Sequence, residues 1–375
     1  HERQRGLQAR EVVGGRAWPV FCEGQGRPAH VLRLSYAPLW RLISLGIIDS
    51  LSAGYRFVGR RLYLLAIPVL LDLLLWLAPR FSIAPLLDGV ATFYADTMTA
   101  AGEQAGAQMT TNLGDIPQMA QMTAATIRLF GEIFNLLTAL VSSTIMHVPS
   151  LVAAWALPTA TGNALEFGNG WAALGIWLGL AVVGLFVGVL FIELLSASLP
   201  LGVSAKPVGV DDLLRATVRH WGRVLRFVLV IALVLMLLLI PYSLVMGLLL
   251  LILPTLAYGI AALSFGMIFV LFIYLYFVTT AIVVDDLGVR DAVRASMTLV
   301  RNNMLRVIGF VVLINVISIG IGLLLNNLAA IQPVGTFAAI LLNAYIGTGL
   351  AMALLVFYRS RLIVAAAGQP INLEP

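Results

Sequence analysis

Residues 285–306 read DDLGVRDAVRASMTLVRNNMLR and form a short basic segment between two long apolar runs. The apolar residues of this segment recur at helical spacing and make one stripe: Val289, Val293, Met297, Val300 and Met304. Its arginines lie off that stripe, at Arg290, Arg294 and Arg301. A basic face opposite an apolar face is typical of a helix that lies in the plane of the lipid headgroups. We therefore predict a membrane-surface helix at this place in the chain.

Two earlier segments, 47–61 and 209–226, share this pattern, and each also precedes an apolar run. Aligned without gaps on Asp49 and Asp212, they match at Leu51/Leu214, Ala53/Ala216, Arg56/Arg219, Gly59/Gly222, Arg60/Arg223 and Leu62/Leu225. In the second segment the arginines follow one another at helical spacing, as Arg215, Arg219, Arg223 and Arg226. The sequence thus predicts three tandem repeats of an amphipathic surface helix plus a hairpin. Three aspartates are expected to cap these helices: Asp49, Asp212 and Asp291.

The composition is that of an integral membrane protein. Hydrophobic residues make up 60% of the 375 residues and charged residues only 11%, whereas soluble domains carry about 25% charged residues. Cys22 is the only cysteine and the four histidines are scattered, so we expect no disulfide framework, no metal and no cofactor. The basic residues lie beside apolar runs and form no separate domain, which gives nucleic-acid binding no support.

Hydropathy predicts an all-α, polytopic membrane protein with about six transmembrane helices. The expected crossings are Leu62–Ala78, Trp171–Leu199, two within 227–284, Val307–Leu325 and Phe337–Tyr358. Pro241 and Pro254 are expected to divide 227–284 into two crossings and an outer re-entrant piece. Most arginines fall in the expected inner loops, while 81–170 contains only Arg128. By the positive-inside rule, both termini are expected on the cytoplasmic side.

Residues 129–157 are apolar enough to cross the membrane, but they contain Glu132, Asn135, His147 and Pro149. A full crossing here would place the first and second basic segments on opposite sides of the membrane, against the positive-inside rule. We therefore interpret this stretch as re-entrant or interfacial on the outer side, broken near Pro149. A complete span remains the alternative. Within 81–128 the pattern predicts two further helices, one before and one after a break at Gly114–Pro117.

The predicted organisation follows the three repeats. Residues 1–40 are polar, begin without methionine and are expected to be a tail that is non-native or disordered. The first repeat is expected at 41–200, with a long extracytoplasmic segment at 81–157. The second is expected at 201–284, the third at 285–365, and a C-terminal tail at 366–375.

The run from 285 to about 325 resembles the membrane domain that is attached to some glycerophosphoryl diester phosphodiesterases of bacteria. The matching pattern is a short helix before a span, with Gly288, Asp291, Ala292, Ser296, Arg301, Asn302 and Arg306. This resemblance implies a multi-pass module of the bacterial cytoplasmic (inner) membrane. Phosphodiesterase activity in that family belongs to a separate soluble barrel, and we expect no such barrel within these 375 residues, so the resemblance implies no such chemistry here.

Asp72 is the sharpest candidate for a functional residue. It lies eleven residues beyond Arg61, or about 16 Å along a helix, near the centre of a bilayer. An intramembrane carboxylate is costly and indicates a functional site by default. The alternative is a carboxylate that is neutralised, or that bonds to a neighbouring helix or to the re-entrant segment. Asn315 and Ser318, at a similar depth in the third repeat, are the expected partners.

Three further polar residues are weaker candidates. Glu193 is expected near the inner interface, paired with an arginine of a surface helix, while Glu132 and His147 are candidates to line an outer vestibule. For the surface helices we expect lipid headgroup or anion binding. The residues assigned to it are Arg56, Arg60, Arg215, Arg219, Arg223, Arg226, Arg294, Arg301 and Arg306.

Two classes of function remain open from the sequence. One is a non-catalytic membrane module that scaffolds a partner or handles lipid at the inner leaflet. The other is a transporter or permease for a small or amphiphilic solute that uses Asp72. No Ser/His/Asp arrangement, phosphate-binding glycine loop or metalloprotease motif points to an enzyme. Expected partners are membrane lipids, and a partner protein or a second copy of the chain.

Overall fold

The computed structural model describes residues 12–13, 16–17, 46–106, 116–143, 146–199 and 209–367. The chain divides into two compact units, His1–Leu42 and Ile43–Pro375. In the first unit the described residues form an antiparallel pair, β1 (Val12–Val13) and β2 (Arg16–Ala17). The rest of the predicted tail, 1–40, and the tail at 366–375 beyond Ala367 lie outside the described residues.

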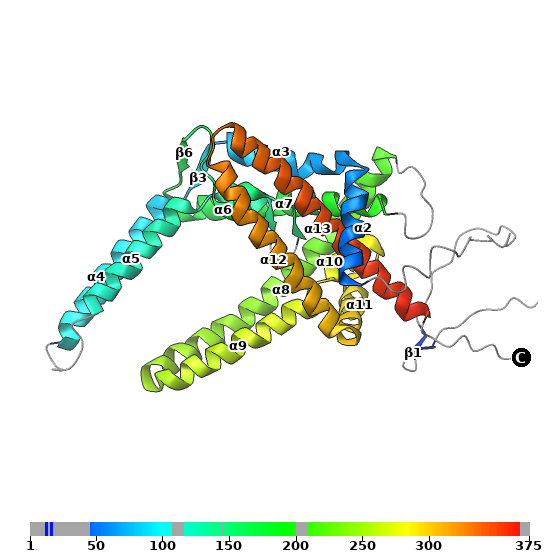
Figure 1. Ribbon diagram of the computed structural model, residues 1–375. Helices are drawn as coiled ribbons and strands as arrows, with labels where there is room; N and C mark the ends of the chain where they lie inside the picture. Colours follow the sequence, from blue (N-terminus) through cyan, green and yellow to red (C-terminus); the bar gives the residue numbers. More distant parts are fainter. Residues whose placement is uncertain are drawn as a thin grey trace, which may run out of the picture. The chain divides into compact units, whose positions relative to one another are not determined.

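The second unit is built from helices (Figure 1). Five stretches in the described part are long and apolar enough to cross a membrane: Gly170–Ala197, Val210–Leu250, Thr255–Val284, Met304–Ala329 and Val334–Leu362. They confirm the prediction of an all-α polytopic membrane protein. The sixth predicted crossing is a shorter apolar stretch, Leu62–Leu77, made of η1 (Leu62–Leu65) and α3 (Ala66–Leu77).

The core is centred on α13 (Val334–Ala367), which packs beside α12 (Met304–Ala329). Phe357 of α13 stacks on Phe310 of α12, with 4.3 Å between ring centroids and 7° between ring planes. Phe277 stacks on the neighbouring Tyr358 at 5.7 Å. All four rings are fully buried, so aromatic packing ties these three segments together.

The first basic segment forms α2 (Ile47–Gly59), which lies directly against α13 (Figure 1). A Cβ added to Gly54 would lie 2.6 Å from the backbone nitrogen of Ala353, and one added to Gly349 would lie 2.4 Å from the Tyr55 ring. Only glycine permits so close an approach. Small residues have the same role where membrane helices pack together. Gly349 thus serves close helix packing, whereas Gly320 of α12 has no neighbour within 4 Å of a built Cβ.

The segment 129–157 contains no helix long enough to span a membrane within its described residues. It consists of the end of α5 (Ile116–Ile133), the short helix η3 (Leu136–Leu140), a strand pair β4 (Ser142–Ser143) and β5 (Met146–His147), and α6 (Leu151–Trp155). η3 packs against α7 (Gly170–Ala197), where Gly184 admits its backbone. This break argues against a complete helical span, and η3 and the start of α6 are largely buried, as irregular backbone at membrane depth must be. That the segment is re-entrant stays a prediction.

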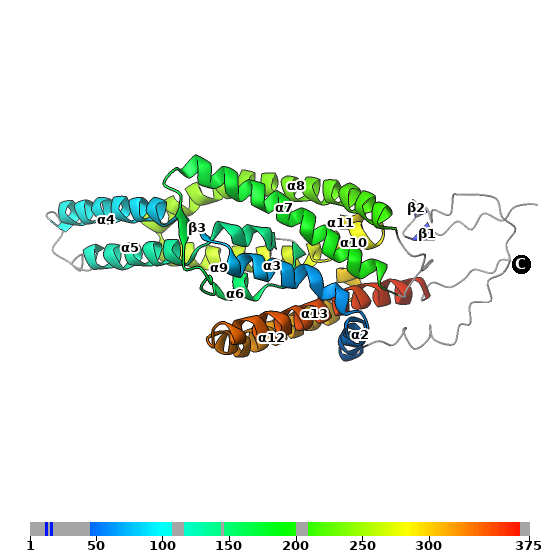
Figure 2. The same ribbon diagram turned by 90° about the horizontal axis from the view of Figure 1, so that it is seen from above.

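Two helices precede this segment, as the sequence predicts. α4 (Ala84–Gly106) and α5 lie side by side (Figure 2), and Arg128 of α5 forms an ion pair with Asp88 of α4 at 2.7 Å. β3 (Arg80–Ser82) lies between α3 and α4, and β6 (Ala164–Glu166) lies just before α7. These two short strands pair in parallel and so join the α3–α4 connection to the segment that leads into α7.

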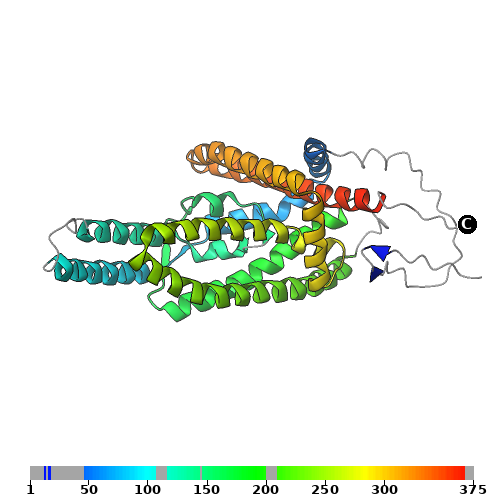
Figure 3. The same cartoon turned by 90° about the horizontal axis from the view of Figure 1, so that it is seen from below.

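The second basic segment continues without a break into a membrane span. α8 (Val210–Ile252) is one helix of 43 residues, about 65 Å long, and Pro241 lies inside it. The chain turns at Leu253 into α9 (Pro254–Leu275), which lies beside α8 (Figure 3) and is followed by α10 (Val278–Val284). The expected division at Pro241 and the expected re-entrant piece are therefore wrong. Pro254 alone interrupts the helix, because proline is well accommodated at a helix start.

The third basic segment forms α11 (Val289–Asn302), which ends just before α12. Glycine occupies the N-cap of all three basic helices, at Gly46, Gly209 and Gly288. The aspartate three residues later is therefore in the first turn and not at the N-cap, which corrects the predicted position. In α2 the Asp49 carboxylate accepts the backbone N–H of Gly46 at 2.9 Å, so it still satisfies a free amide.

Candidate functional site

Asp72 is fully buried on α3 and faces the start of α6. Its carboxylate accepts the backbone N–H of Leu151 at 2.9 Å and that of Val152 at 3.4 Å, together with the hydroxyl of Ser150. Ser150 is itself the N-cap of α6. These donors are the amides that a helix leaves unpaired at its N-terminus, so Asp72 acts as a second, distant cap.

The structure therefore contains the alternative predicted for Asp72, in which the carboxylate bonds to the segment 129–157. The expected partners are wrong. Asn315 is exposed on α12 and donates its side-chain amide to the Val311 carbonyl at 2.8 Å, and Ser318 is exposed on the same helix. Neither is a donor to Asp72, whose three donors are adjacent residues of one chain segment.

Glu193 belongs to a buried polar cluster that joins three parts of the chain. It lies on α7 and hydrogen-bonds to Nδ1 of His220 on α8, and both side chains are nearly fully buried. Nε2 of His220 contacts Asp286, between α10 and α11, at 2.9 Å. Glu193 was expected to pair with an arginine, and its partner is instead this histidine of the same basic helix.

Asp286 also binds the neighbouring arginines of α8. Arg223 lies 2.5 Å from one of its carboxylate oxygens and donates to its backbone carbonyl at 2.9 Å, while Arg219 lies 3.4 Å from the other oxygen. The backbone of Asp286 is left-handed, with φ of 53°. This turn lets consecutive aspartates face different helices, because Asp285 accepts from Tyr358 and Arg359 of α13 at 2.6 and 2.8 Å. The turn thereby links α8 to α13.

Acidification is expected to weaken the Asp286 contacts. Partial burial raises the pKa of the carboxyl, but hydrogen bonds from His220 and Arg223 and the nearby arginine charges outweigh this effect and hold the pKa below 3.8. A carboxyl whose pKa is lower in the folded than in the unfolded state stabilises the folded protein above about pH 4. This contribution is lost as the pH falls through the folded-state pKa. Unfolding followed by circular dichroism should therefore lose less stability between neutral and acidic pH in Asp286→Asn than in the parent protein. Equal losses would contradict the assignment.

The arginines of the three basic helices fall into two groups. Arg219 and Arg223 are held by Asp286, and Arg294 lies 3.7 Å from Asp291. The others are exposed and form no ion pair among the described residues: Arg56, Arg60, Arg215, Arg226, Arg290, Arg301 and Arg306. The opposite face of α11 is buried, at Ala292, Ser296, Leu299 and Val300. The arginines of α11 are exposed as predicted, but the predicted apolar stripe is not the buried face: of its members only Val300 is buried, while Met297 and Met304 are exposed.

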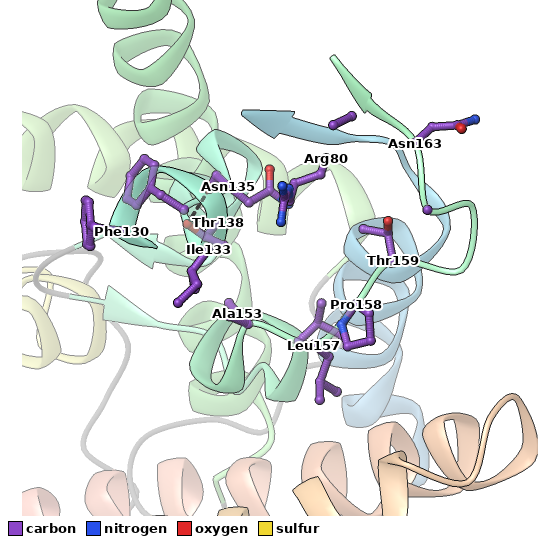
Figure 4. Close-up of a pocket in the computed structure, with 15 residues that line it drawn as sticks. Arg80, Phe130, Ile133, Asn135, Thr138, Ala153, Leu157, Pro158, Thr159 and Asn163 are labelled. Atoms are coloured by element: carbon purple, nitrogen blue, oxygen red, sulfur yellow. Dashed lines mark hydrogen bonds between the residues drawn. The ribbon is translucent and has the colours of Figure 1, made fainter. Parts of the chain in front are cut away.

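A pocket of about 400 Å³ lies among α5, η3, α6 and the β6 loop (Figure 4). Arg80 is the only charged residue among those that line it. Glu132 is exposed on α5 and does not line this pocket, and its predicted place in an outer vestibule stays untested. The structure describes only the backbone of His147, which lies in β5 and pairs with Ser142 of β4. The predicted role of the His147 side chain stays untested.

Sequence reasoning missed three functional candidates: His220, Asp286 and Arg80. His220 had a usable signal, because a lone histidine in a row of arginines on a helix before a span calls for an acidic partner. Arg80 looked like an ordinary charge that ends an apolar run. In the described ranges no three His, Cys, Asp or Glu side chains gather closely enough to hold a metal ion.

Comparison of this chain with protein-family models, curated proteins and solved structures gave no match.

Proposed function

We propose that this chain is a non-catalytic integral membrane module that handles anionic lipid, or scaffolds a partner, at the inner leaflet of a bacterial cytoplasmic membrane. The supporting observation is a basic surface, defined here as the exposed arginines of α8, α11 and the start of α12. They are Arg215, Arg219, Arg226, Arg290, Arg294, Arg301 and Arg306. The resemblance of 285–325 to the membrane domain of certain phosphodiesterases agrees with a module of this kind.

The chemistry of this surface suits a layer of phosphate headgroups. Arginine side chains beside a membrane span gain about 1 kcal/mol each from an anionic leaflet. Guanidinium groups also bind phosphate oxygens in a bidentate manner. Asp286 and Asp291 are the acidic residues that form ion pairs on this surface, and only with Arg219, Arg223 and Arg294. The remaining arginines are available to headgroups or to an acidic partner.

The proposed topology has six crossings in three repeats, with both termini in the cytoplasm. Leu62–Leu77 would be the sixth crossing, which five long spans need in order to return the chain to its starting side. Its apolar character supports this assignment, as does Arg61, which precedes it on the proposed cytoplasmic side. The shared Gly-x-x-Asp start of the three basic helices supports a threefold repeat.

The permease alternative has less support. It depends on an intramembrane carboxylate that water or solute can reach, and Asp72 has no exposed surface. All the donors described for it belong to the start of α6, which explains a buried carboxylate without transport. A solute path would have to open through the contact of α3 with α6.

Replacing Arg215 and Arg226 with glutamine should weaken the binding of anionic phospholipid by about 2 kcal/mol, or roughly thirtyfold. These residues are suitable because they are exposed and form no described ion pair, so their loss leaves the Asp286 contacts intact. Native mass spectrometry of the protein in uncharged detergent, titrated with phosphatidylglycerol and with phosphatidylcholine, measures the effect. Phosphatidylcholine binding should not change.

Arg128→Gln is the matched control, since Arg128 is also exposed but lies on the α4–α5 hairpin. It should retain the parent affinity for phosphatidylglycerol. If the Arg215 and Arg226 double variant binds this lipid as tightly as the parent, lipid handling at the basic surface is wrong. A stoichiometric protein partner that the same variant loses would then favour the scaffold half of the proposal.

A further inference from the structure

The pocket beside Arg80 is at the far end of α7 from the basic surface. β6, whose Ala164 lines the pocket, comes just before α7 begins at Gly170, whereas Glu193 near the other end of α7 contacts His220. The 28 residues of α7 separate these ends by about 42 Å. Ligands at the basic surface and in this pocket would therefore be independent of one another.

Arg80 is held in place by its backbone while its charge is left unpaired. Its amide donates to the Asn163 carbonyl at 2.9 Å, and β3 pairs with β6 from this residue onward. Among the described residues its guanidinium has no hydrogen-bond or ion-pair partner. Figure 4 shows this group beside Asn135, at one side of the pocket. A half-buried guanidinium in an otherwise uncharged pocket favours an anion as its occupant.

Asn135 supplies a second donor at the same place. Its side-chain Oδ1 accepts the backbone N–H groups of Phe81 and Leu137, at 3.0 and 3.1 Å. These two bonds fix the amide orientation, because Nδ2 cannot accept an N–H. Nδ2 donates to no described residue, so its hydrogens remain for an oxygen of the ligand. An oxyanion bound to Arg80 and Asn135 would thus receive hydrogen bonds from both side chains, of which the Asn135 amide is fixed in orientation.

The remainder of the pocket wall is mainly apolar. Phe130 and Ile133 of α5 and Leu157 after α6 supply the larger side chains, and Ala153 supplies a small one (Figure 4). Free inorganic phosphate would leave these surfaces in contact with water. A ligand with an apolar tail would cover them and gain about 25 cal/mol for each Å² that it buries. The volume falls within the range of about 300–1,000 Å³ typical of small-molecule sites.

We propose that this pocket binds a single-chain anionic amphiphile, with its carboxylate or phosphate head on Arg80 and Asn135 and its tail against Phe130, Ile133 and Leu157. A fatty acid and a lysophospholipid share this chemistry. The site lies apart from the basic surface, and it needs no second acyl chain. This feature separates it from the headgroup binding proposed for the arginines of α8 and α11.

The test uses a decanoic acid that carries a photoreactive diazirine on its tail, with the whole 375-residue chain in nanodiscs of zwitterionic phosphatidylcholine. Peptide mass spectrometry should place crosslinks within 130–138 and 152–164. Arg80→Gln should lower this labelling about tenfold to a hundredfold, which corresponds to the loss of a charged hydrogen bond. The corresponding alcohol should label the pocket weakly, and an excess of lysophosphatidic acid should compete with the labelled acid.

Two variants keep the outcome decisive. Arg128→Gln removes an exposed arginine elsewhere and should leave the labelling unchanged, while Ala153→Phe fills the pocket and should abolish it with Arg80 intact. Equal labelling of the acid and the alcohol, or labels confined to α8 and α9, would overturn the proposal. The Arg215 and Arg226 double variant should retain pocket labelling, so failure of the lipid proposal for the basic surface does not decide this one.

Discussion

Gly184→Ala is expected to destabilise the folded protein by about 3 kcal/mol, the upper end of the cost of overpacking a core. A Cβ at Gly184 would lie 2.5 Å from the carbonyl oxygen of Leu140 and 2.6 Å from that of Ala139. Both are backbone atoms of η3, and they cannot move aside as a flexible side chain can. The measurement is unfolding of the detergent-solubilised protein, followed by circular dichroism.

Gly179→Ala on the same helix is the matched control. Nothing lies within 4 Å of a Cβ built at Gly179, so this change should be neutral or stabilise the protein by up to about 1 kcal/mol, since alanine favours helix. The contrast isolates the contact between η3 and α7 from helix propensity. If both variants unfold like the parent, η3 does not pack on α7 as described, and the enclosed arrangement of 129–157 is wrong.

The long helices were predictable because their signal is local. An uncharged run about 20 residues long can bury itself only by spanning a membrane, and α7, α12 and α13 each contain such a run. The helical spacing of the basic segment likewise predicted that the arginines of α11 lie on one exposed face. Pro241 led to the wrong prediction of a break within 227–284. A proline is typical of a turn, but it can also be tolerated inside a long apolar helix.

The polar contacts were not predictable, because each joins residues that are distant in sequence. Asp72 meets its donors 78 to 80 residues later, and His220 meets Glu193 and Asp286 at separations of 27 and 66. The expected depth in the bilayer suggested Asn315 as the partner of Asp72. In the structure, its partners are instead the unpaired backbone amides at the start of α6. A helix of five residues gives almost no periodic signal, so the segment 129–157 could be named as an alternative partner but the donors within it could not.

Asp72→Ala is expected to cost about 3 kcal/mol of stability or more. The substitution leaves the buried amides of Leu151 and Val152 without an acceptor, and each buried unpaired group costs about 1–3 kcal/mol. It also removes a negative charge from a helix N-terminus. Unfolding by heat in detergent, read by circular dichroism, gives the loss. Asp88→Asn is the control, because its ion pair with Arg128 is largely exposed and is worth at most about 1 kcal/mol.

Asp72→Asn separates the structural role of this residue from a role in transport. Asparagine retains the shape and one acceptor oxygen, but its amide nitrogen would oppose one of the donors from α6, so stability should fall by about 1–3 kcal/mol. Ser150→Ala, which removes the other contributor to this cap, should be non-additive with it. A cap therefore predicts coupled losses of stability. If Asp72→Asn folds like the parent and abolishes the uptake of a solute into proteoliposomes, the carboxylate serves transport and the lipid module proposal gives way to a permease.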